Sequence, residues 1–275
     1  MEIDGRVAVV SGAGSGIGRA SALVLARAGA RVVVADIGDG AGQETVVLIR
    51  DRGGVAEFVH VDVGIEEEIR RMLAAAEELY GGLHILHNNA GILTAGARFP
   101  KTPPDRFMRV VDINLRGVML ATYHAIPIMH RSGGGVIVQT ASSAAVGPHR
   151  LHPEYAASKA GALNFTRSLT YLEEDYGIRV ACICPGLVRT SLAAHAAAAM
   201  PPEDREAFVQ LRSALRERPH LEAEKSCQLS RRRDVRVHCV GDGRAARRVL
   251  RTDPGPLRYR GSRLRSPAGD LHAWW

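Results

Sequence analysis

A tyrosine and a lysine near the middle of the chain have the types and spacing of an acid/base pair. They lie in the run Tyr155-Ala-Ala-Ser-Lys159, and residues four apart on a helix share one face. A cation beside a phenol favours the phenolate, so we expect the tyrosine pKa to fall from about 10 toward the operating pH. Such a tyrosine exchanges a proton with an alcohol or ketone oxygen while hydride moves to or from a nicotinamide. The same spacing is common on exposed helices, so its weight depends on the surrounding residues.

Two polar residues are placed to assist this pair. Ser142 follows the expected strand 135–140, at the strand end where open α/β sheets bind their ligands. Its hydroxyl can polarise the reacting oxygen, and Ser143 is the alternative. Asn114 falls inside an expected helix, where asparagine is disfavoured. We interpret it as holding water or backbone near Lys159 rather than as a solvent-facing residue.

A glycine-rich segment after the first expected strand predicts a phosphate-binding loop, Ser11-Gly12-Ala-Gly14-Ser-Gly16-Ile-Gly18. Glycines permit a tight turn and a close backbone approach, so a pyrophosphate can lie at the helix N-terminus. The pattern is G-x-x-x-G-x-G, because Ile17 interrupts G-x-G-x-x-G. An ordinary turn is the alternative, but the position at the first strand–helix junction favours binding. No lysine follows as in an NTPase P-loop.

Asp36, at the end of the second expected strand, indicates which nicotinamide cofactor is used. A carboxylate there accepts hydrogen bonds from the adenosine ribose and repels a 2′-phosphate. Neither Ser15 nor Ile37 supplies a compensating cation. A solvated aspartate beginning a loop is the alternative. We favour the binding role, and therefore NAD over NADP.

Val- and Ile-rich runs alternate with helical patterns and predict a doubly wound parallel sheet, a three-layer α/β/α Rossmann fold. The expected strands are residues 6–10, 31–36, 55–61, 84–88, 135–140 and 179–183, and the expected helices 16–29, 40–52, 66–80, 104–131 and 154–176. The strands lack polar alternation, as expected when helices cover both faces. Cys182 and Cys184 should share one strand face and pack as small apolar groups. The four cysteines form no zinc pattern, and we expect no metal.

In order and spacing, these motifs resemble the short-chain dehydrogenase/reductase family over residues 4–192. The further matching pieces are Asp62-Val63, Asn88-Asn89-Ala90-Gly91, Thr140-Ala-Ser142 and Pro185-Gly186-Leu-Val188-Arg-Thr190. The resemblance implies an NAD(P)-dependent oxidoreductase that interconverts a secondary alcohol and a ketone. It implies catalysis by Tyr155, Lys159 and Ser142, with Asn114 completing a proton relay.

The resemblance also implies a set of cofactor contacts. It places Asp62 and Val63 near adenine, Lys159 on the nicotinamide ribose, and Pro185, Gly186, Val188 and Thr190 beside the carboxamide. The remaining contacts are Gly12, Ser15, Gly16, Ile17, Gly18, Asp36, Asn89, Ala90, Gly91 and Tyr155. A homodimer or homotetramer through two long helices is implied as well.

The substrate pocket is expected from residues 144–154 and 192–200, with Leu93 and Thr94 as a further wall. His195 is the one charge-capable side chain in 192–200, which favours an apolar alcohol or ketone, such as a steroid-, terpene- or acyl-like compound. His149 and His152 receive no role, because loop histidines are more often solvated or already hydrogen-bonded. We expect a dehydrogenase domain over residues 1–222, with a substrate lid around 190–216.

Residues 223–275 form an Arg-rich tail that departs from the family. Residues 227–275 hold 12 Arg and 4 Asp, so the net charge of +7 belongs to the tail and the rest of the chain is near neutral. Residues 235–240 resemble a final strand. We favour the alternative, a replaced segment of low order after residue 222. Nucleic-acid binding by 231–233 and 247–248 is not expected, because interleaved aromatics and a binding fold are lacking.

The beginning of the chain shows no secretory signal and no apolar run spans a bilayer, so we expect a cytoplasmic protein without membrane contact. Two other functions stay open. One is an NADPH-dependent carbonyl or 3-oxoacyl reductase, which Asp36 disfavours. The other is a catalytically impaired NAD-binding protein, which the intact Ser142, Tyr155 and Lys159 disfavour.

Overall fold

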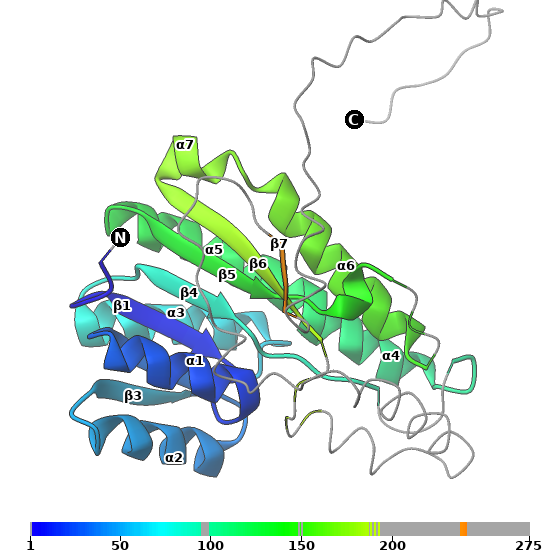
Figure 1. The fold of residues 1–275 in the computed structure, drawn as a ribbon, viewed down its shortest axis with the longest axis horizontal. Helices are drawn as coiled ribbons and strands as arrows, with labels where there is room; N and C mark the ends of the chain where they lie inside the picture. Colours follow the sequence, from blue (N-terminus) through cyan, green and yellow to red (C-terminus); the bar gives the residue numbers. More distant parts are fainter. Residues whose placement is uncertain are drawn as a thin grey trace, which may run out of the picture.

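A parallel sheet of seven strands, in the order β3-β2-β1-β4-β5-β6-β7, forms the centre of the molecule (Figure 1). The computed structural model describes residues 2–94, 99–147, 149, 151–186, 188, 190, 192 and 237–240. The strands are β1 Val7–Ser11, β2 Arg31–Asp36, β3 Val55–His60, β4 Ile85–Asn88, β5 Gly135–Thr140, β6 Ile178–Pro185 and β7 Val237–Val240. The order reverses between β1 and β4, which is where a doubly wound sheet opens a crevice for ligands. The expected doubly wound fold is confirmed.

Helices cover both faces of this sheet, because successive apolar side chains of a strand point to opposite sides. Ala8 and Val10 pack with α1 (Gly16–Arg27) and α2 (Asp39–Arg50). Val7 and Val9 pack on the other face with α3 (Glu66–Tyr80) and α5 (Gly117–Arg131). The remaining helices are α4 Pro104–Val111, α6 Pro153–Ser168 and α7 Leu172–Tyr176, with short turns η1 Asp112–Arg116 and η2 Ser143–Ala145.

The two cysteines of β6 pack as the sequence predicts. Cys182 and Cys184 form no disulfide and are fully buried in one apolar cluster with Ala141 and Leu163. They therefore act as small apolar side chains between β6 and α6.

The sequence predicts two long continuous helices, and both are interrupted in the structure. The helix over 104–131 is interrupted by the π-helical turn η1, which separates α4 from α5. The helix over 154–176 divides into α6 and α7. At the division, the Leu169 N–H bonds to the Thr166 carbonyl and the Leu172 N–H to the Leu169 carbonyl. These three-residue hydrogen bonds tighten the chain and end the α-helical turn.

The favoured interpretation of the tail is also wrong at four residues. Val237–Val240 forms β7, parallel to β6, with Cys184 opposite Cys239 and Pro185 opposite Val240. The alternative, a final strand, is the one observed. The rest of the tail, its arginine clusters and most of the expected lid lie outside the described residues. Among the described helices, none is long and apolar enough to cross a membrane. The described residues also contain no cluster of three or more His, Cys, Asp or Glu side chains that could bind a metal ion.

Candidate active site

The phosphate loop is tightly packed and has no room for side chains at its glycines. Gly12 has φ +64° and Gly16 has φ +55°, in the left-handed region that favours glycine. A Cβ added at Gly12 would lie 2.8 Å from the Ala90 Cα, and one at Gly18 would collide with the Gly12 carbonyl oxygen. A Cβ at Gly16 would lie 3.1 Å from Thr190 Cγ2. The predicted residues at the ends of β1, β4 and β6 therefore meet around one loop.

Asp36 is held against this loop by two backbone amides. Its Oδ2 accepts a hydrogen bond from Gly14 N at 2.7 Å, and its Oδ1 accepts one from Gly38 N at 2.9 Å. The carboxylate is half-buried at the end of β2, and each oxygen keeps a lone pair free for a further donor. Asp36 thus joins the end of β2 to the phosphate loop.

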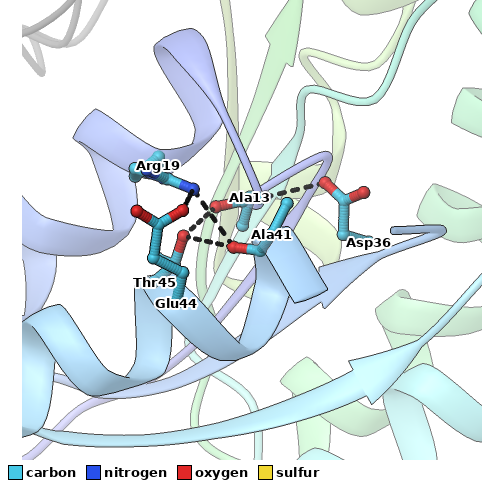
Figure 2. A network of polar contacts seen from close by, with 7 residues as sticks. Ala13, Arg19, Asp36, Ala41, Glu44 and Thr45 are labelled. Carbon is cyan, nitrogen blue, oxygen red and sulfur yellow. Dashed lines mark hydrogen bonds and ion pairs between the residues drawn. The ribbon is translucent and has the colours of Figure 1, made fainter. Parts of the chain in front are cut away.

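A neighbouring arginine, not considered from the sequence, is neutralised by an acid on α2. Figure 2 shows Arg19 directed toward Glu44 and the Ala41 carbonyl, with Nη2 distances of 2.7 and 3.2 Å. Thr45 Oγ1 donates to the Ala13 carbonyl at 3.0 Å and so ties α2 to the loop. Arg19 directly follows Gly18, so the sequence places it near the phosphate loop at the start of α1. Its ion pair with Glu44 of α2 depends on tertiary packing and is not visible in the sequence.

Tyr155 and Ser142 come together where β5 ends and α6 begins. Tyr155 lies in the first turn of α6 and is 9% exposed, and the Ser142 side chain lies close enough to lower the pKa of its phenol. Ser142 precedes η2, and its Oγ also accepts from Ala144 N at 3.2 Å. Ser142, and not the alternative Ser143, is therefore the serine that contacts the tyrosine.

The expected lowering of the tyrosine pKa is wrong in this structure. Burial raises the pKa of Tyr155, and the Ser142 side chain opposes that shift without reversing it. Lys159 Nζ lies 5.9 Å from the centroid of the phenol ring and donates to the Thr140 carbonyl at 2.7 Å. Burial also lowers the pKa of Lys159, to about 8. Desolvation of both groups, which the spacing of two residues does not reveal, dominates at this site.

Asn114 lies in the π-helical turn and is fully buried. Its Oδ1 accepts from Ile92 N at 2.8 Å, and its Nδ2 donates to Ile92 O at 2.9 Å and to Ser158 Oγ at 3.2 Å. A Cβ at Gly91 would lie 3.1 Å from Asn114 Oδ1 and 3.2 Å from Lys159 Nζ. Asn114 therefore anchors the loop after β4 beside the lysine, and π-helical turns are frequent at functional sites.

The residues predicted near adenine and the carboxamide lie at the same edge of the sheet. Asp62 Oδ1 accepts from Gly64 N at 2.8 Å, and its Oδ2 pairs with Arg109 of α4. Val63 and Val188 are buried, and Pro185 ends β6. Asp62 thus stabilises its own turn, and its carboxylate is already engaged by α4.

The expected pocket loop includes buried polar contacts that the sequence did not predict. Thr94 Oγ1 donates to Glu154, which links the loop after β4 to the first turn of α6. The His149 and His152 rings stack with centroids 5.5 Å apart, and the His149 ring is 6.3 Å from that of Tyr155. Burial lowers the pKa of His149. The sequence signal that could have drawn attention to Glu154 is its place in the first turn of a helix, where acidic side chains are favoured.

The chain is similar to a protein family, to named dehydrogenases and to solved structures that all belong to one class of oxidoreductase. The family model described as short chain dehydrogenase matches residues 6–201. Borneol dehydrogenase of Lavandula x intermedia is 38% identical over 191 residues, 69% of this chain and 72% of that protein. Cyclohexanol dehydrogenase of Acinetobacter sp. is 35% identical over 193 residues, 70% of this chain and 77% of that protein. The solved structure of a short chain dehydrogenase/reductase from Burkholderia phymatum in complex with NAD superposes with a TM-score of 0.73 at 30% identity, covering 82% of this chain and 84% of that one.

Proposed function

Because this chain belongs to the short chain dehydrogenase family of oxidoreductases, we propose that it interconverts an alicyclic secondary alcohol and its ketone with NAD, using Tyr155 as acid/base. The observation that carries this proposal is that Tyr155, in the first turn of α6, and Ser142, just after β5, lie close enough for Ser142 to lower the pKa of the phenol. Lys159 on the same helix face and Asn114 behind it complete the proposed catalytic set.

The protein groups perform the proton half of this reaction. In alcohol oxidation, Tyr155 takes the hydroxyl proton while Ser142 hydrogen-bonds the reacting oxygen. Bound NAD would accept the hydride from the alcohol carbon. Because burial raises the pKa of Tyr155, the phenol is protonated at neutral pH and ready to donate to a ketone. Oxidation needs the phenolate, so its rate should rise with pH.

Several features support NAD as the cofactor. The glycines fix the shape of the phosphate loop, since a Cβ at Gly12 or Gly18 would collide with neighbouring backbone, and a glycine-rich turn at a helix N-terminus can bind a pyrophosphate. The Asp36 carboxylate would accept from the ribose hydroxyls and repel a 2′-phosphate. The nearby cation on α1, Arg19, is paired with Glu44 and is therefore not available to balance the charge of a 2′-phosphate. We propose that cofactor contacts come from Gly12, Ser15, Gly16, Ile17, Gly18, Asp36, Asp62, Val63, Asn89, Ala90, Gly91, Tyr155, Lys159, Pro185, Gly186, Val188 and Thr190.

Two observations support the proposed substrate class. Relatives of this chain bear the names of dehydrogenases of cyclohexanol and borneol, which are alicyclic secondary alcohols. Leu151, in the expected pocket loop, is buried and apolar. An apolar ring carrying one hydroxyl group is therefore the proposed substrate.

We also propose that the enzyme is a cytoplasmic homodimer or homotetramer. Met119 and Tyr123 on α5 are 43% and 70% exposed, an apolar surface suited to an interface between copies. The buried, reduced thiols of Cys182 and Cys184 are compatible with a reducing compartment.

Titration of the full chain with NADH and NADPH, followed by nicotinamide fluorescence, tests the cofactor proposal. NADH should bind more tightly than NADPH, both to the parent protein and to a Tyr155→Phe variant. Tighter binding of NADPH would instead support the carbonyl reductase alternative.

A panel of alcohols then tests the reaction. The parent should oxidise cyclohexanol or borneol, and the Tyr155→Phe variant should lose at least a hundredfold in rate, as expected when a general acid/base is removed. Turnover of sugars or polyols alone, or full activity in the variant, would refute the proposal.

A further inference from the structure

His87 occupies a buried position between the phosphate loop and the catalytic strand. It lies in β4, opposite Val10 of β1 and Val138 of β5, and is 3% exposed. It lies one residue before the end of β4 and has no part in the proposed catalysis. Burial lowers its pKa to about 4, so the ring is neutral at physiological pH and carries a single N–H.

The carbonyls of the phosphate loop fix the orientation of a neighbouring amide. Asn89 Nδ2 lies 3.1 Å from the Ser11 carbonyl oxygen and 3.2 Å from that of Gly12. Carbonyl oxygens only accept, so the amide nitrogen of Asn89 must face the loop. Its Oδ1 then faces Thr140 Oγ1, 3.3 Å away.

This orientation determines the direction of the next two hydrogen bonds. Because Asn89 Oδ1 only accepts, the Thr140 hydroxyl donates its one hydrogen to it. Thr140 Oγ1 is also 2.9 Å from His87 Nε2, and in this bond the oxygen can only accept. The proton of the His87 ring is therefore on Nε2, and the order of donation is His87 to Thr140 to Asn89 to the phosphate loop.

We propose that His87 is a positioning residue that holds the phosphate loop in its cofactor-binding conformation through Thr140 and Asn89. A second set of bonds joins the same elements: Ser11 Oγ accepts from Asn89 N at 3.0 Å and donates to the His87 carbonyl at 3.4 Å. The Thr140 carbonyl also accepts from Lys159 Nζ. Thr140 therefore connects the lysine to the loop that would hold the pyrophosphate. This inference rests on the proposed NAD-dependent function.

The test compares NADH binding by the parent, His87→Leu and His87→Gln, with circular dichroism showing that each is folded. Leucine fills the space but donates no hydrogen bond, whereas the glutamine amide can donate from the position of Nε2. We expect His87→Leu to raise the Kd for NADH about fivefold, the effect of one buried neutral hydrogen bond. His87→Gln should stay within twofold of the parent. In His87→Leu the KM for NAD should rise and the KM for the alcohol should not.

Thr140→Val provides an independent test, because it removes the hydroxyl and keeps the carbonyl that binds Lys159. It should weaken NADH binding at least as much as His87→Leu, and the double variant should be no weaker than Thr140→Val alone. An unchanged Kd in His87→Leu, equal losses in the leucine and glutamine variants, or multiplied losses in the double variant would overturn the inference. A parent protein that bound neither nucleotide would overturn the proposed function, and this inference with it.

Discussion

Replacing the buried lysine of the site should make the protein more stable while it abolishes activity. Burial lowers the pKa of Lys159 to about 8 from an ordinary value of 10.5. A lysine in the unfolded chain keeps the ordinary value, so the charged side chain favours the unfolded state at neutral pH. At about 1.4 kcal/mol per pKa unit, this destabilisation is on the order of 3 kcal/mol.

The gain in Lys159→Met is smaller than this figure, because the variant also loses a contact. The ammonium group donates to the Thr140 carbonyl at 2.7 Å, and an acceptor deprived of its donor costs about 1–2 kcal/mol. We therefore expect Lys159→Met to raise the free energy of unfolding by about 1–2 kcal/mol at pH 7.

The sign of the difference depends on pH. The unfolded state binds more protons than the folded state between pH 8 and pH 10.5, so the parent protein gains stability as pH rises through that window. At pH 10 most of the destabilisation by the charge is gone and only the lost hydrogen bond remains. The advantage of Lys159→Met should vanish or reverse there.

Urea denaturation at pH 7 and pH 10 measures both differences, since alkaline titration of other groups is common to all variants. Lys101→Met is the control: this lysine is exposed, and its variant should stay within about 0.5 kcal/mol of the parent at both pH values. If the free energy of unfolding of Lys159→Met were below that of the parent by the same amount at pH 7 and pH 10, burial would not be destabilising the charged lysine. That result would refute the reasoning.

Further predictions concern the loop, the cofactor and the acid/base pair. Gly18→Ala should weaken NADH binding at least tenfold in the fluorescence titration, because its Cβ would collide with the Gly12 carbonyl. Gly40→Ala is the control and should bind NADH like the parent, because there is open space at its Cβ. Equal binding by both variants would contradict the role of the glycines in cofactor binding. Asp36→Ala should reduce the preference for NADH over NADPH at least tenfold, and an unchanged ratio of Kd values would exclude Asp36 as the determinant. Asn114→Ala should lower the free energy of unfolding by about 1–3 kcal/mol, because it removes the partner of two half-buried backbone groups of Ile92. A melting temperature equal to the parent's would count against this role. Alcohol oxidation should accelerate from pH 6 to pH 9, because burial raises the pKa of the catalytic phenol, and a flat rate profile would show that the phenol does not limit the reaction.

The sheet was predictable because its signals are local. Strands β2 and β5 were predicted to the residue, since each is an apolar run with a sharp boundary at a charged residue, glycine or polar end. The association of Tyr155 with Ser142 follows from the same logic, because both flank the end of one parallel strand.

Features that depend on tertiary contacts were not predictable. The π-helical turn changes backbone hydrogen-bond partners within one continuous helical stretch, and no glycine or proline marks the division between α6 and α7. The pKa of Tyr155 rises because of burial from several elements, which outweighs anything that its spacing from Lys159 suggests. His87 reads as one more residue of a buried strand until its partners on β5 are known.

The π-helical turn at Asp112–Arg116 has a consequence for the length of this chain. A π turn accommodates one residue more than the α-helix around it, so the segment is equivalent to a single-residue insertion. Deleting any one of its five residues would allow α4 and α5 to join as one uninterrupted α-helix. The wider turn absorbs the extra residue, so the side chains on either side of the deletion would keep their relative orientation. The change would fall on the turn itself, where the Asn114 amide binds the backbone of Ile92. A chimaera that exchanges this helix with a relative must therefore transfer the turn as a unit, because the turn with its extra residue carries Asn114.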